Sequence, residues 1–181
     1  MTMNLSDANS NCRLVGNPLL DAVDRQLDAI VHALTGPGLI EIERFVAEPI
    51  RAMLLDDATN APLKPSGIGR GHAINHDKNI RSDSIAWLTG ATRAQQIFIV
   101  AMERLRHHLN RKLYLGLFDY ECHYACYRPG QCYRKHRDVF ADSAPQQRRI
   151  LTTICYLNDT WVPDNAGELV IYSNNDRELT Q

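Results

Sequence analysis

The 181-residue sequence is 44% hydrophobic and 23% charged, which suits one compact domain or slightly more. Its formal net charge of -1 excludes the strong basic excess of proteins that bind nucleic acids or anionic membranes. The sequence has neither an apolar run of membrane-spanning length nor a charged-then-apolar secretory leader, so we expect a cytoplasmic location.

The N-terminal part begins with a polar, aperiodic stretch, residues 1–16, which predicts a disordered tail. Pro18 then opens an amphipathic helix that Gly36-Pro37-Gly38 ends. One face of this helix carries the apolar residues Leu20, Val23, Leu27, Ile30, Val31 and Leu34.

The next segments predict a strand, a helix and a loop. Residues 39–46 (LIEIERFV) alternate apolar and charged side chains, as a half-buried strand does. Residues 47–55 favour a helix that tolerates Pro49 only in its first turn. Residues 61–80 are rich in proline and glycine, which indicates either a mobile substrate-facing loop or a plain linker.

Two segments in the middle of the chain combine apolar and charged positions. In residues 79–88 (NIRSDSIAWL), composition places Trp87 in the core and predicts a local ion pair between Arg81 and Asp83. Residues 92–109 predict an amphipathic helix, which needs a partner surface for its apolar face.

The C-terminal third contains three runs rich in aromatic and β-branched residues, at 120–138, 149–158 and 167–172, which predict strands. His136 and Asp138 are two residues apart, so in an extended segment their side chains project to the same side. Such a pair can supply two of the three ligands of a 2-His-1-carboxylate site for Fe(II). Taken alone, the pair is weak evidence, and a solvated pair in a loop would be the better interpretation.

Cysteine usage offers another hypothesis. Five cysteines leave at least one unpaired, and a chain of this size needs no disulfide framework. Cys122, Cys126 and Cys132, with His123 or His136, raise the alternative of a structural zinc site. Because the short CxxC spacing of such sites is absent, packing in the core is favoured over zinc binding.

The motifs of the C-terminal third follow one another in a recognisable order. Residues 126–138 read CYxPGxxYxxHxD, residues 149–158 read RxxTxxxYLN, and GELVIY follows at 167–172. This order resembles the prolyl-hydroxylase branch of the Fe(II)- and 2-oxoglutarate-dependent dioxygenases, in particular the oxygen-sensor type and its bacterial relatives. The resemblance extends over residues 17–175, and residues 80–88 resemble the family segment IRxDxIxWL.

The resemblance implies roles for individual residues. His136 and Asp138 correspond to the catalytic metal ligands, and Arg81 and Asp83 to residues that brace the active-site region. Arg149 lies near the site strand but not at the position of the family's basic anchor. The 2-oxoglutarate pocket is expected to contain Tyr127, Tyr133, Thr152 and Tyr156.

The resemblance also implies an α+β fold. An N-terminal helical and strand region, residues 17–118, would support the first half of a double-stranded β-helix, or jelly roll, in residues 119–181. Family members continue with three more strands, which bring a second histidine and a basic anchor for 2-oxoglutarate. In this sequence His136 is the last histidine before Gln181, so the expectation is a jelly roll that lacks its last strands.

The implied reaction is the hydroxylation of a C–H bond with release of succinate and CO2, using O2, Fe(II) and 2-oxoglutarate. Ascorbate is a further candidate cofactor, and the substrate would be a peptidyl proline, another protein residue or a small molecule. Two alternatives stay open. One is an inactive truncated fragment or binding module of the same family, which would lack a stoichiometric Fe(II) site. The other is a Cys/His zinc-binding protein.

Overall fold

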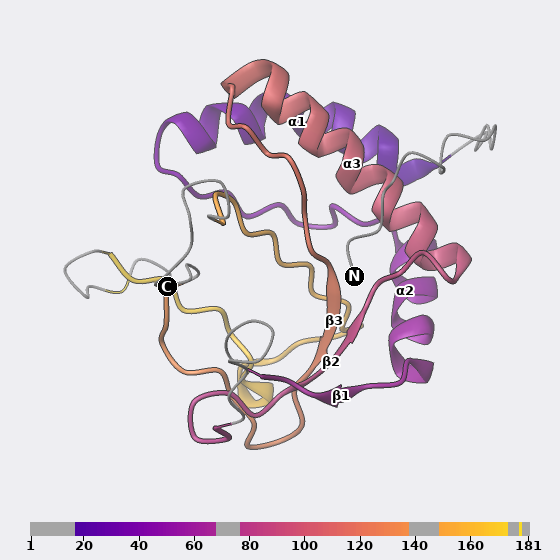
Figure 1. Ribbon diagram of the computed structural model, residues 1–181, viewed down its shortest axis with the longest axis vertical. Helices are drawn as coiled ribbons and strands as arrows, with labels where there is room; N and C mark the ends of the chain where they lie inside the picture. Colours follow the sequence, from indigo (N-terminus) through magenta and orange to yellow (C-terminus); the bar gives the residue numbers. More distant parts are fainter. Residues whose placement is uncertain (1–16, 68–76, 138–148, 174–177, 179–181) are drawn as a thin grey trace.

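The structure is a computed structural model that describes residues 17–67, 77–137, 149–173 and 178. The predicted tail, residues 68–76 of the predicted loop and Asp138 lie outside the described residues. Figure 1 shows α1 and α3 side by side at one end of the molecule and the strands at the other. The elements in chain order are α1 (Pro18–Thr35), α2 (Glu48–Asn60), β1 (Lys64–Pro65), β2 (Ser84–Trp87), α3 (Arg93–Leu113), β3 (His123–Cys126) and the 3-10 helix η4 (Pro163–Asn165).

The predicted helices are confirmed. The patterns that predicted them involve residues that are close together in the sequence. Asn17 caps α1 by accepting a 3.0 Å hydrogen bond from the Leu19 N–H, and the predicted glycine-proline-glycine stop follows Thr35. Helix α3 begins after its cap, Thr92, and extends four residues beyond the predicted end to Leu113. The two helices pack together through fully buried aliphatic side chains, among them Leu19, Val23 and Leu109. None of the described helices combines the length and apolar character needed to cross a membrane.

A buried polar network joins these helices to the sheet. The Gln95 Oε1 accepts hydrogen bonds of 3.0 to 3.3 Å from three consecutive backbone N–H groups, those of Thr89, Gly90 and Ala91. Its Nε2 donates to the Asp57 carboxylate on α2 at 2.9 Å, and the Tyr124 hydroxyl on β3 donates to the same carboxylate oxygen at 2.8 Å. One glutamine therefore links α2, α3 and the turn between β2 and α3.

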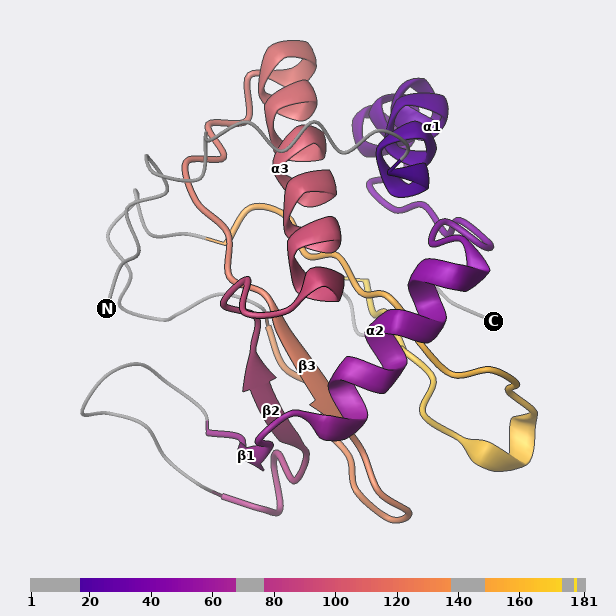
Figure 2. The same ribbon diagram turned by 90° about the vertical axis from the view of Figure 1, so that its right-hand side faces the viewer.

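The sheet has the order β1-β2-β3 with antiparallel neighbours. Tyr124 and Ala86 are opposite each other and buried on the face toward the helices. Figure 2 shows the sheet below α3 and beside α2. The sequence did not predict β1, because proline and glycine dominate its surroundings. A two-residue edge strand nevertheless tolerates Pro65.

The predicted strand at residues 39–46 is wrong. The structure has turns there, and Arg44 adopts a positive φ of 53°, which interrupts an extended backbone. The apolar side chains that produced the alternation, Ile40, Ile42 and Phe45, still pack against the helical core. Periodicity therefore reported burial correctly but not backbone conformation.

The predicted strands at 149–158 and 167–172 are also not formed; the described residues there are irregular, apart from an isolated bridge between Tyr172 and Glu178. A strand requires a hydrogen-bonded neighbour, and among the described residues these segments have no strand partner. Arg51 on α2 instead holds this region by donating to the Leu157 carbonyl and the Asp159 carboxylate. The described residues thus form an α+β structure, and the jelly roll stays a prediction.

The Gln95 network generates a stability prediction. We expect Gln95→Ala to destabilise the protein by about 1–3 kcal/mol, because it leaves part-buried backbone N–H groups and the Asp57 carboxylate without this partner. The measurement is urea unfolding followed by far-UV circular dichroism. The matched control is Gln96→Ala on the exposed side of α3, for which we expect a change within about 0.5 kcal/mol. Equal losses in the two variants would contradict this account.

Candidate active site

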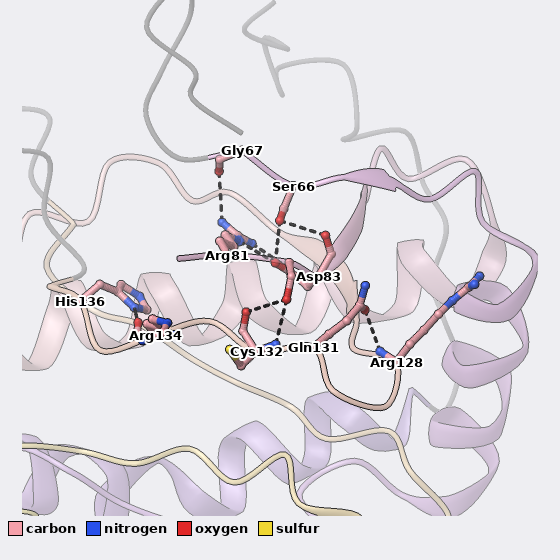
Figure 3. A network of polar contacts seen from close by, with 10 residues as sticks. Ser66, Gly67, Arg81, Asp83, Arg128, Gln131, Cys132, Arg134 and His136 are labelled. Atoms are coloured by element: carbon pink, nitrogen blue, oxygen red, sulfur yellow. Dashed lines mark hydrogen bonds and ion pairs between the residues drawn. The ribbon is translucent and has the colours of Figure 1, made fainter. Parts of the chain in front are cut away.

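The segment that carries the predicted metal ligands lies against residues 80–83. Arg81 and Tyr133 form an antiparallel bridge, flanked by hydrogen bonds from the Arg134 N–H to the Ile80 carbonyl and from the Ser82 N–H to the Cys132 carbonyl, at 2.9 and 3.1 Å. The Ser82 hydroxyl accepts from the Cys132 N–H at 2.9 Å (Figure 3). The motif is therefore fixed by a distant stretch of the chain.

A tight turn leads into this segment. The Gln131 N–H donates to the Arg128 carbonyl, and the Gln131 side chain accepts from the Arg128 N–H at 2.7 Å (Figure 3). Gly130 has a φ of +81°, which a residue with a Cβ rarely adopts. The Pro129-Gly130 pair of the motif thus has a conformational role: it reverses the chain after Tyr127.

The predicted ion pair between Arg81 and Asp83 is present and buried. Arg81 donates two hydrogen bonds to the Asp83 carboxylate, at 2.8 and 3.0 Å, and the Ser66 hydroxyl donates a third at 2.6 Å. Asp83 is only 1% exposed. Burial opposes ionisation of this carboxyl, but the hydrogen bonds from Arg81 and Ser66 outweigh it and hold its pKa below the usual value.

Two further side chains are stacked on Arg81 of this pair. The guanidinium carbon of Arg81 lies 4.6 Å from the centre of the Tyr133 ring, a cation–π contact. On Tyr133 lies the imidazole of His136, with ring centres 3.6 Å apart and an interplanar angle of 14°. Among the predicted site residues, the structure therefore brings together Arg81, Asp83, Tyr133 and His136.

The hydrogen bonding of His136 bears on metal binding. Its Nδ1 lies 2.7 Å from the Arg134 carbonyl oxygen, which can only accept, so Nδ1 carries the proton (Figure 3). In the neutral ring, the lone pair is then on Nε2, which is the form in which a histidine binds a metal. The imidazole is exposed. This tautomer of His136 is compatible with metal binding, while the predicted carboxylate partner, Asp138, lies outside the described residues.

Tyr127 interacts electrostatically with Asp83, Arg81 and Tyr133, so it lies near this group. Burial and the charge of Asp83 raise the pKa of Tyr127 to about 12, so its hydroxyl stays protonated at neutral pH. The Tyr156 hydroxyl donates to the Gly167 carbonyl at 3.0 Å, and Thr152 is exposed. Arg149 lies 3.9 Å from the Glu121 carboxylate. Ser66 was missed by sequence reasoning, because a serine in a proline-rich loop gives no signal of its partner.

The zinc alternative finds no support in the described residues. Cys122, Cys126 and Cys132 are free thiols. Burial raises the pKa of Cys122 to about 11, which disfavours the thiolate that a zinc ligand requires. Within residues 17–67, 77–137, 149–173 and 178, no group of three or more His, Cys, Asp or Glu side chains is placed to hold a metal ion.

Two comparisons with known proteins bear on this site. A family model described as the 2OG-Fe(II) oxygenase superfamily matches residues 122–181, which include the whole motif-bearing segment. The fold is similar to the crystal structure of a Pseudomonas putida prolyl-4-hydroxylase, with a TM-score of 0.69 and 27% sequence identity over 85% of this chain and 80% of that one. The family match over the C-terminal third and the similarity of the fold together support a 2OG-Fe(II) oxygenase of the prolyl-4-hydroxylase type.

Proposed function

We propose that the protein is an Fe(II)- and 2-oxoglutarate-dependent dioxygenase that hydroxylates a C–H bond of a protein substrate, with peptidyl proline as the first candidate residue. The observation that carries this proposal is the state of His136. Its Nδ1–H is held by the Arg134 carbonyl, which leaves Nε2 as the metal-binding nitrogen within a motif of the oxygenase family. Similarity to a bacterial prolyl-4-hydroxylase favours proline over other residues.

In this proposal, His136 and Asp138 bind the metal, and the residues around them orient the co-substrate. Fe(II) with 2-oxoglutarate and O2 would supply oxidative decarboxylation to succinate and CO2, one oxygen atom entering succinate and the other the hydroxyl group of the substrate. Tyr127, protonated at neutral pH, can donate a hydrogen bond to a carboxylate of the co-substrate. A buried dicarboxylate requires such donors, because an unpaired buried charge is strongly unfavourable. Tyr156 and Thr152 are assigned to the same task, for which Tyr156 would exchange its Gly167 partner.

Asp83 has a different task from Asp138. Its carboxylate oxygens are engaged by Arg81 and Ser66, and the side chain is buried, so it does not compete for the metal. Arg81 remains charged in this pair and supports Tyr133, on which His136 is stacked. The ion pair therefore positions the ligand histidine without touching the metal.

The metal assignment predicts the loss of a spectroscopic signal. Anaerobic addition of Fe(II) and 2-oxoglutarate to the purified chain is expected to give the visible charge-transfer band of the chelate. His136→Ala and Asp138→Ala should abolish the band, because each removes a ligand. His32→Ala, on the exposed side of α1, is the control and should retain it. A band of full intensity in His136→Ala would refute the assignment, and its absence from the parent chain would indicate the inactive alternative.

The buried pair predicts a pH-dependent loss of stability. Arg81→Met is expected to destabilise the protein by about 3–5 kcal/mol at pH 7, because Asp83 keeps a buried charge without its partner. Since the folded-state pKa of Asp83 is lowered, its stabilising contribution is present above its unfolded pKa of 3.8 and is lost as the pH falls through the folded value.

Urea unfolding at pH 7 and at pH 3 measures both effects. The difference between the parent and Arg81→Met should shrink at the lower pH, where Asp83 in the variant becomes protonated. The double variant Arg81→Met with Asp83→Leu should recover much of the loss, since it removes the uncompensated charge. A pH-independent loss that the second substitution does not reduce would contradict the role of this pair.

A further inference from the structure

The sheet has one open face that the proposed function does not yet explain. Side chains alternate along a strand, so on β3 His123 and Ala125 lie opposite to the buried Tyr124. On β2, the partners of His123 and Ala125 in the register are Trp87 and Ile85. Trp87 is 53% exposed, so the prediction from composition that placed it in the core is wrong. This face therefore presents an aromatic side chain and an imidazole away from the helical core.

His123 is held in a defined position on this face. Its ring meets the Trp87 indole edge-on, with ring centres 5.1 Å apart and an interplanar angle of 67°. Sequence reasoning considered His123 only as a zinc ligand, and the described residues contain no such cluster. The contact with Trp87 orients the imidazole but does not use its polar nitrogens.

The rows of side chains on this face continue to residues of the candidate active site. By the same alternation, Asp83 continues the row of Trp87 and Ile85, and Tyr127 continues the row of His123 and Ala125. Four residues of strand separate the Cα atoms of His123 and Tyr127 by about 13 Å. The side chain between them, Ala125, is small and exposed. A small dicarboxylate can therefore reach both side chains from above the strand.

The electrostatic surroundings of His123 favour its neutral ring, which can donate one hydrogen bond to an anion. Burial lowers the pKa of His123, and the positive charges of Arg81 and Arg149 lower it further, against the opposing carboxylates of Asp83 and Glu121. At neutral pH the ring therefore carries one N–H that can donate to an anion. Both arginines have acidic neighbours, Asp83 at 2.8 Å and Glu121 at 3.9 Å, so the surroundings of His123 contain charges of both signs.

We propose that His123, held edge-on to Trp87 on the open face of β2 and β3, is a further binding residue that donates a hydrogen bond to a carboxylate oxygen of bound 2-oxoglutarate. This inference rests on the proposed function and adds a residue to the same site. Trp87 has a positioning role, since it fixes the plane of the imidazole.

Binding measurements on matched variants test the proposal. His123→Leu should raise the Kd for 2-oxoglutarate by about tenfold or more, because a hydrogen bond to a charged group is lost. His123→Gln keeps an N–H donor and should lose less. The affinity for Fe(II) alone should stay unchanged in both variants. The Kd is measured anaerobically from the charge-transfer band, with His32→Leu on α1 as the control.

A second measurement follows the protonation of His123 itself. It requires neither turnover nor a substitution at the proposed binding site. In Trp161→Phe, Trp87 is the remaining tryptophan, and its fluorescence should fall as the adjacent imidazole becomes protonated at acidic pH. Saturating 2-oxoglutarate with anaerobic Fe(II) should move this transition to higher pH, because a nearby anion favours the protonated ring. The transition should be absent from His123→Gln in the same background.

The outcomes separate this inference from the proposed function. If the parent gives the charge-transfer band but His123→Leu binds 2-oxoglutarate as tightly as the parent, the inference is overturned while the dioxygenase assignment stands. A fluorescence transition that saturating 2-oxoglutarate leaves unmoved overturns it as well. This second result decides the question even if His123→Leu fails to fold. Absence of the band from the parent overturns both proposals.

Discussion

The buried ion pair between Arg81 and Asp83 is the constraint on which the candidate site depends. A carboxylate that is 1% exposed is tolerable only when hydrogen-bond donors surround it, and here they come from Arg81 and from Ser66 in a separate segment. This requirement fixes where residues 64–67 and 80–83 meet. The same arginine then stacks on Tyr133, so the position of His136 follows from the satisfaction of a buried charge.

The sheet connects this pair to the helical core and gives each face a separate role. Tyr124 on one face reaches the Asp57 carboxylate, which Gln95 also contacts, and so fixes β3 relative to α2 and α3. Because the strand alternates, the neighbouring side chain His123 must lie on the other face, toward the candidate site. The alternation of side chains along β3 thus places Tyr124 in the polar network of the core and His123 on the proposed binding surface.

Patterns among residues close together in the sequence predicted the helices. The strands and the candidate site depend instead on contacts between residues that are far apart in the sequence. The apolar stripes of residues 18–35 and 92–109 depend on residue spacings within one or two turns, so both helices were found correctly. The local pair of Arg81 and Asp83 was also predicted. Ser66 as its third partner and the stack of Arg81 on Tyr133 were not, because no pattern links segments that are so far apart. The alternation at 39–46 failed for a related reason, since it reports burial, and a left-handed Arg44 can satisfy burial without a strand.

The single side-chain amide of Gln95 has consequences for the joint between α2 and α3, because its nitrogen and its oxygen have different partners. Its nitrogen is 2.9 Å from the Asp57 carboxylate, so hydrolysis of the amide would create a glutamate whose oxygen meets a second carboxylate at hydrogen-bond distance. Deamidation at this one site would thus turn an attraction between two helices into a repulsion.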